Sequence, residues 1–288
     1  MIRETLAKAF RRGASMRGTI IDLVVLAAAT GTLHLLLPLH SALSAIERVP
    51  VSLMQSVRMG MFGTERWLDA ELPLWNPYLY GGFPFHATGW GGIFYPANRA
   101  YLEYDLLVAL RFDLAVHALV ASLGAYALAR GLYVRRLPAV LVGVLAVYAW
   151  PSAALLGGAT ITAVRAFAWF PWIVLFVRRA LVSGNPFWGL LLSLATAAQI
   201  FSGAVSFSAA SIALAMAYAW FDGLRRYFVD WERLGLVIQK VLVASLGIVV
   251  GVALAGAQAV PSVEFLRHGW EASKWLAATP GEMITRAH

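Results

Sequence analysis

The sequence contains no cysteine, which excludes disulfide bonds and cysteine-based metal sites and leaves the redox compartment open. Charged residues are also scarce, at 13% of 288 residues, whereas a soluble domain usually carries about 25%. What remains is mostly apolar, because 60% of the residues are hydrophobic and the mean hydropathy is +0.70. This composition excludes an ordinary soluble domain and predicts a protein that lies in a lipid bilayer.

Hydrophobic runs of the length that a bilayer requires, roughly twenty residues, recur along the chain. The first, "TIIDLVVLAAATGTLHLLLPL" at 19–39, follows a basic N-terminus at 1–18 and is interpreted as a retained signal-anchor. We therefore expect an all-α polytopic transmembrane helical bundle of about seven spans, with an outer loop at 40–105 and an outer C-terminal tail at 259–288. The other six spans fall within 106–258, at about 106–129, 138–156, 161–178, 186–201, 207–221 and 234–258.

Acidic residues are few as well, 15 against 23 Lys and Arg, which gives a net charge of +8. With a cytoplasmic N-terminus, seven spans place 14 of the 23 basic residues but only 4 of the 15 acids on the cytoplasmic side. This is the positive-inside pattern of membrane proteins. The excess of basic residues is therefore explained by orientation in the membrane and by attraction to anionic lipid. The same pattern argues against nucleic acid as a partner. The C-terminus is then expected outside.

The expected outer loop is long, but its aromatic, Gly-rich and Pro-rich composition is not that of a disordered segment. Its "LPLWNPYLYGGFPF" run at 72–85 cannot be a spanning helix, because Pro73, Pro77 and Pro84 lack backbone donors. Before it, residues 51–72 carry apolar side chains at helical intervals, which predicts an amphipathic helix along the membrane surface. The loop is therefore expected to be a structured cap.

Three runs in and after this loop occur together: "LPLWNPYLYGGFPF", "FYPAN" at 94–98 and "HALVASLGAYALARGL" at 117–132. With them the chain resembles, over most of residues 65–266, the bacterial YfhO-like family of polytopic membrane proteins, which is related to the GT-C glycosyltransferases. The resemblance is to a short form of that family. It implies a location in the bacterial cytoplasmic (inner) membrane.

The resemblance implies an enzyme that moves a sugar from a polyprenyl-phosphate donor to an acceptor outside the membrane. Such enzymes use an acidic residue of the first outer loop as base or metal ligand. Glu47 lies at a comparable place, where an aspartate is expected, and Asp69 comes later, beside the aromatic motif. These two are the catalytic candidates. A divalent metal would suit that role, but the sequence shows no clear ligand set, so the cofactor is left unknown.

Sugar transfer also needs positive charge at the leaving phosphate. Arg99, Arg111 and Arg165 are the candidates for it, and His86 adds an imidazole. Aromatic side chains of the loop would stack on sugar faces, or would form the Trp/Tyr belt usual at a membrane interface. The remaining substrate-binding candidates of the loop are Trp75, Asn76, Tyr78 and Tyr95.

Asp113 and His117 are four residues apart in the second span and share a helix face, whereas Arg111 points elsewhere. Ionisable groups in a span usually face the bundle interior or a watery cavity. Three alternatives stay open. The residues line a groove where Arg111 holds a lipid phosphate, they form an internal ion pair with Arg165 or a partner chain, or they are part of a metal site.

Small residues fill the later spans, with Gly247 and Gly251 four apart as in helix-association faces. They pack within the bundle, or they dock another membrane subunit. A different class of function therefore stays open: a non-catalytic, shortened relative that serves as an assembly subunit of a larger membrane complex. The departure at Glu47 and the end of the chain after span seven favour that alternative.

Overall fold

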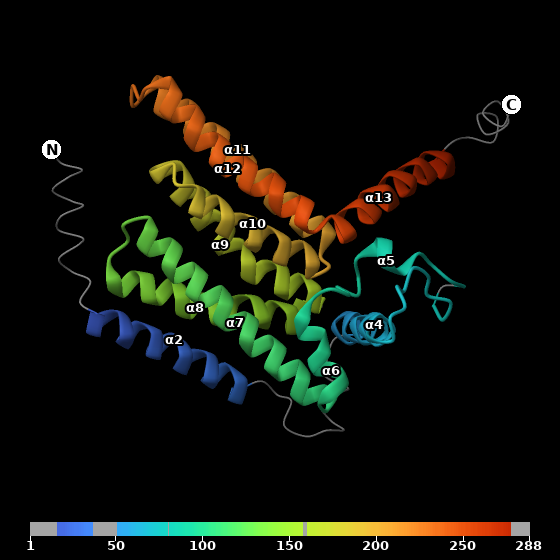
Figure 1. Cartoon of the computed structure of the whole chain (residues 1–288). Helices are drawn as coiled ribbons and strands as arrows, with labels where there is room; N and C mark the ends of the chain where they lie inside the picture. The colour runs from blue at the N-terminus through green and yellow to red at the C-terminus, as the bar shows by residue number, and fades with distance from the viewer. Residues whose placement is uncertain (1–15, 37–50, 80, 158–159, 278–288) are drawn as a thin grey trace, which may run out of the picture.

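The computed structural model describes residues 16–36, 51–79, 81–157 and 160–277, and within these ranges the regular elements are helices (Figure 1). An isolated antiparallel bridge also joins Asn76 and Phe83. The all-α prediction is therefore confirmed for the described part of the chain. The long helices are α2 (Met16–Leu36), α7 (Leu106–Gly131), α8 (Arg136–Gly157), α9 (Ile161–Ser183), α10 (Pro186–Phe201), α11 (Val205–Phe228), α12 (Leu234–Leu254) and α13 (Gly256–Ala277).

Four of these helices, α7, α9, α11 and α12, are long and apolar enough to cross a bilayer. Shorter apolar stretches lie in α2, α8 and α10. Length and composition thus indicate an α-helical membrane protein whose surroundings are lipid.

α7 and α9 are the central pair. About half of the apolar window of each is buried by protein, 50% in α7 and 56% in α9, against 28% in α11 and in α12. The outer helices therefore leave most of their apolar surface for other contacts, whereas α7 and α9 carry the polar groups of the interior.

The glycine pair of α12 packs within the bundle. A Cβ at Gly247 would lie 2.8 Å from the carbonyl oxygen of Gly189 in α10, and one at Gly251 would lie 2.6 Å from Cβ of Thr196. Such close backbone approach is what small residues permit between membrane helices. Of the two alternatives for these glycines, the structure therefore shows packing within the bundle.

A cap made of the described residues 51–105 covers one end of the bundle. It contains α4 (Val51–Leu68) and three short elements: α5 (Phe85–Thr88), the 3-10 helix η1 (Pro96–Arg99) and α6 (Ala100–Glu103). In Figure 1, α4 is seen along its axis while α7 runs across the view, so the two helices are steeply inclined to each other.

α4 occupies the stretch for which a helix is predicted, although it ends at Leu68. Its apolar face is buried, with Leu53 at 0% and Val57 at 1% exposure, in a cluster that also holds Leu110 of α7 and Ile161 of α9. This face therefore packs against protein. The predicted helix is confirmed, and its position along the membrane surface stays a prediction.

The cap also meets the turn between α10 and α11. Gly203 in this turn has a φ of +94°, a left-handed conformation that suits glycine, and a Cβ there would clash with the Gly89 carbonyl and lie 2.9 Å from the Gly92 nitrogen. This backbone-to-backbone packing joins the glycine-rich part of the loop to the bundle.

Candidate functional site

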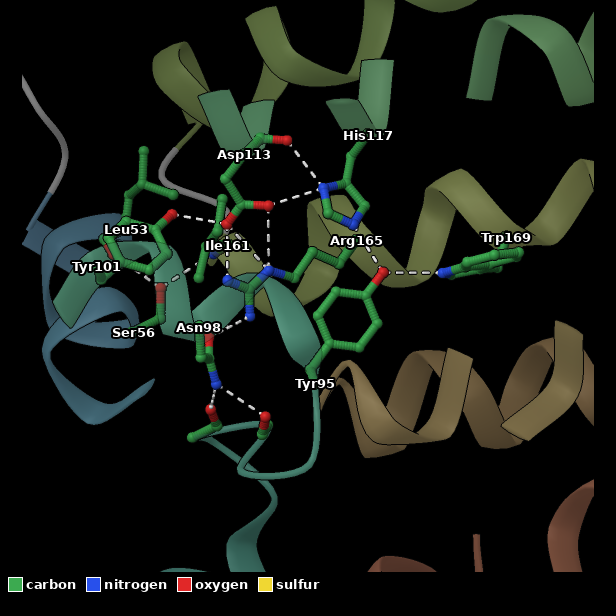
Figure 2. Close-up of polar contacts among 12 residues, drawn as sticks. Leu53, Ser56, Tyr95, Asn98, Tyr101, Asp113, His117, Ile161, Arg165 and Trp169 are labelled. Carbon is green, nitrogen blue, oxygen red and sulfur yellow. Dashed lines mark hydrogen bonds and ion pairs between the residues drawn. The ribbon is translucent and has the colours of Figure 1, made fainter. Parts of the chain in front are cut away.

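The most deeply buried charges of the described chain are an ion pair between the two central helices. Arg165 Nη2 of α9 lies 2.6 Å from Asp113 Oδ2 of α7, and Arg165 Nε donates to the same oxygen at 3.1 Å. Both residues are at most 1% exposed. Figure 2 shows the two side chains pointing toward each other, next to Asn98 and Tyr101 of the cap.

The residues at which α7 and α9 begin determine where along the two helices this ion pair lies. Asp105 caps α7 by accepting from the backbone N–H of Leu107, and Thr160 caps α9 by accepting from Ala163. Ser56 of α4 accepts from the Ile161 backbone N–H, which ties the start of α9 to the cap. Local capping chemistry thus sets where both helices begin, and the charged residues follow within them.

The cap closes over the ion pair with polar side chains. The hydroxyl of Tyr101 donates to Asp113 Oδ2 at 2.6 Å, and Asn98 Oδ1 accepts from Arg165 Nη1 at 2.7 Å. The amide nitrogen of Asn98 donates to the carbonyls of Gly91 and Gly92 at 2.7 and 2.8 Å. One asparagine therefore connects the glycine-rich loop to the charge of α9.

A second hydrogen-bond chain runs through His117. Trp169 Nε1 can only donate, and it donates to the hydroxyl oxygen of Tyr95 at 2.9 Å. That hydroxyl lies 2.6 Å from His117 Nε2, and His117 Nδ1 lies 2.7 Å from Asp113 Oδ1. The arrangement fits a neutral imidazole with its proton on Nδ1, which accepts from Tyr95 and donates to Asp113. These residues are called the polar cluster: Asp113, His117, Arg165, Trp169, Tyr95, Asn98 and Tyr101.

The two tyrosines of the cap are strongly perturbed by this environment. Burial raises the pKa of Tyr95 to about 12, against opposing effects of Trp169 and Arg165. Burial, with the Asp113 carboxylate second, also raises the pKa of Tyr101 well above its ordinary value. Both phenols are therefore protonated at physiological pH, as their donor roles require.

The contacts of the polar cluster are those of a structural site that holds the cap to α7 and α9. The Asp113 carboxylate accepts from Arg165, Tyr101 and His117, and packing closes the group from solvent. The internal ion pair that the sequence leaves open is thus present, with Arg165 as the partner. Within the described ranges, no group of three or more His, Asp or Glu side chains gathers to hold a metal ion.

The other predicted residues of the loop are spread over the cap. Asp69 is exposed just after α4, and Arg99 pairs with Glu103 at 2.6 Å on the surface. Trp75 and Tyr78 are 56% and 72% exposed. None of these side chains joins Asp113 and Arg165 in one groove, as a catalytic centre built from Asp69 would require.

Three further candidates have positions of their own. Asn76 is buried, and its Oδ1 accepts from the Tyr78 backbone N–H. His86 is buried with Nε2 2.8 Å from the Ala257 carbonyl of α13, and Arg111 is partly buried on α7. Glu47 lies outside the described residues.

Sequence reasoning missed part of the polar cluster. Asn98 lies in the FYPAN run, which was noted only for resemblance, and nothing in the spacing of Asn98, Tyr101 or Trp169 indicates a polar role. It also missed a pocket of about 440 Å³ between the cap and the bundle. Five segments line it: Ser52–Met59 of α4, 87–90 of the cap, 160–163 at the start of α9, 203–207 at the start of α11, and 262–266 of α13.

The fold and this polar interior define an α-helical membrane protein with a cap fastened to its two central helices. The chain matches no protein-family model, no curated protein sequence and no solved structure.

Proposed function

We propose that the protein is a GT-C-like membrane glycosyltransferase that moves a sugar from a polyprenyl-phosphate donor to an acceptor on the outer side of a bacterial cytoplasmic membrane. The observation that supports this proposal is the pocket between cap and bundle. Its lining combines hydroxyl groups with aromatic rings, which is the combination that suits a sugar, and it lies at the end of the bundle where the WNPY motif sits.

The proposed base is Glu47. It precedes Ser52, a residue of the pocket lining, by five positions in the sequence. Asp69, the other candidate, is exposed at the end of α4 and does not line the pocket. The nearness of Glu47 to the lining in sequence, and the exposed position of Asp69 outside the pocket, are the grounds on which we propose Glu47 as the group that deprotonates the acceptor hydroxyl.

The test is transfer of a radiolabelled sugar from polyprenyl phosphate by the purified protein in liposomes. Glu47→Gln keeps the size of the side chain and removes its basicity, so transfer should fall by about 100-fold or more. Asp69→Asn is the matched control and should keep the wild-type rate. Loss of transfer in Asp69→Asn with normal activity in Glu47→Gln would reverse the assignment, and no transfer by the wild type with several donor sugars would overturn the proposal.

A second candidate function, an assembly subunit of a larger membrane complex, is favoured by two observations. None of the described residues that line the pocket is ionisable, and the Asp113–Arg165 pair is closed by packing. Extraction from native membranes in mild detergent separates the two hypotheses. A large defined assembly would support the subunit, and a monomer or small homo-oligomer would contradict it.

The proposal also includes seven spans with the N-terminus inside. Since the chain has no cysteine, single cysteines can report on topology without background. Tyr78 and Trp231 are 72% and 86% exposed, so neither substitution should disturb packing. Tyr78→Cys should react with an impermeant maleimide in intact cells, and Trp231→Cys should react only after the membrane is opened. The reverse pattern would invert the topology.

A further inference from the structure

The pocket between cap and bundle has an unusual lining for a site on a basic protein. Its described lining contains no Lys, Arg, His, Asp or Glu side chain. Instead it offers seven hydroxyls and one amide, from Ser52, Gln55, Ser56, Thr88, Thr160, Thr162, Ser206 and Ser262. Its volume of about 440 Å³ falls in the range of small-molecule sites, roughly 300–1,000 Å³.

Three of these hydroxyls belong to a fixed framework. Ser56, Thr162 and Ser262 are between 1% and 6% exposed, and each has a hydrogen-bond partner in the protein. A hydroxyl has one donor and two acceptor positions, so a partnered hydroxyl keeps capacity for a ligand. The polar wall is thus positioned by the fold before any ligand arrives.

Aromatic and aliphatic side chains complete the lining. Trp90 is 47% exposed, and its ring lies against Phe83 with centroids 5.9 Å apart. Phe207 and Phe265 add apolar surface from α11 and α13. A sugar ring has the matching surfaces, because its C–H faces are apolar while its edge carries hydroxyls.

A lipid-linked sugar has a charged phosphate and a neutral sugar, and the uncharged lining of the pocket favours one of them. A phosphate in this pocket would lose water without gaining a cationic partner from the described lining, which is costly for a charged group. Thr160 already caps the start of α9, and the start of α11, which has no side-chain cap, supplies only about half of one positive charge. A neutral polyol loses less on burial and uses the same hydroxyls.

We infer that this pocket binds an uncharged polyhydroxylated group, the glycosyl part of a ligand, and that an attached phosphate lies outside it. This inference deepens the proposed function in assigning the group to a transferred or accepted sugar. Trp90 provides the ring platform, and the serine and threonine hydroxyls bond the sugar edge.

The experiment compares two probes with the same alkyl chain, n-octyl β-D-glucoside and n-octyl phosphate. Each is titrated below its micellar concentration into the purified full chain, held in a detergent without a sugar head group. Calorimetry should show at least about tenfold tighter binding of the glucoside. Equal or tighter binding of the phosphate overturns the inference.

Variants locate the binding. Trp90→Ala removes the ring platform and Ala204→Leu fills the pocket from the α11 side, so each should weaken glucoside binding by about tenfold. Trp67→Ala is the matched control, because Trp67 of α4 is a cap tryptophan with 46% exposure against 47% for Trp90, it also contacts a phenylalanine ring, and it lies outside this pocket. Ser206→Lys places a cation in the lining and should bring the phosphate probe to the affinity of the glucoside. Unchanged glucoside binding in both pocket variants contradicts the inference.

Failure of the inference and failure of the proposed function give different results. Sugar transfer by a protein whose glucoside binding is untouched in Trp90→Ala and Ala204→Leu would keep the function and remove the pocket assignment. Glucoside binding that these variants abolish, in a protein that transfers no sugar, would keep the pocket and remove the enzyme.

Discussion

Arg165 of α9 and Asp113 of α7 are joined by three hydrogen bonds: Nη2 and Nε donate to Oδ2 at 2.6 and 3.1 Å, and Nε also donates to Oδ1 at 3.4 Å. Removing two charges from water is costly, and attraction offsets that cost only when further hydrogen bonds complete the site. Tyr101, His117 and Asn98 supply those bonds from α6, α7 and η1. The pair therefore selects one arrangement of the two central helices and the cap.

Removing one charge of this pair should be far more harmful than removing both. Asp113→Asn keeps the shape of the side chain but leaves the Arg165 guanidinium buried without a counter-charge, so we expect a loss of about 3–5 kcal/mol in unfolding free energy. The double variant with Asp113→Leu and Arg165→Leu should lose less stability than either of its single variants, and therefore less than their sum. Denaturant unfolding in mixed micelles measures the wild type, Asp113→Asn, the double variant and its two single variants. Strict additivity would show that the two residues are not coupled.

Replacement of Asn98 even by a residue of the same shape should lower stability. Asn98→Asp keeps an acceptor for Arg165 but loses the donor to the Gly91 and Gly92 carbonyls, which then face an oxygen. Leaving buried polar groups unsatisfied costs about 1–3 kcal/mol. We expect that loss in thermal unfolding, together with faster proteolysis of the cap.

Asn185→Asp is the matched control for this change. Asn185 caps the exposed start of α10, where aspartate serves equally well. An equal loss of stability in both variants would mean that the Asn98 amide donor does not hold the loop.

The sequence was sufficient for the parts of this structure that repeat locally. Apolar runs and helical spacing predicted α2, α4 and α7 to α12, but not α13 in the expected tail. The four-residue spacing of Asp113 and His117 placed both on one face, where their side chains now meet. Asn98 and Trp169 could not be found that way, because their partners lie 67 and 74 residues away and no period connects them. The pocket could not be predicted for the same reason, because single serines and threonines from five segments form no sequence pattern and come together only in the fold.

Gly203 should tolerate no side chain. Gly203→Ala would combine a strained φ of +94° with a clash against the Gly89 carbonyl. Backbone strain alone costs about 1–3 kcal/mol, and the displaced loop adds to that loss. Gly81→Ala separates the two effects, because Gly81 has a φ of +76° with no atom within 4 Å of its Cβ position. Thermal unfolding should therefore show a larger loss at position 203 than at position 81, and equal losses would exclude the packing contribution.

The stability of the cap should fall at high pH through Tyr95. Burial raises the pKa of this phenol from 10.0 to about 12, so the folded state binds its proton more tightly than the unfolded state does. The resulting stabilisation is complete below pH 10 and is lost as pH rises toward 12, with a total of roughly 3 kcal/mol at most. Tyr95→Phe cannot ionise and should flatten this part of the stability curve, although Tyr101 still contributes in the same direction. Denaturant unfolding at a series of pH values, with tyrosinate absorbance recorded in parallel, measures both effects. If wild type and Tyr95→Phe lose stability in parallel over this range, the phenol of Tyr95 is not held in the buried donor role that its contacts with His117 and Trp169 indicate.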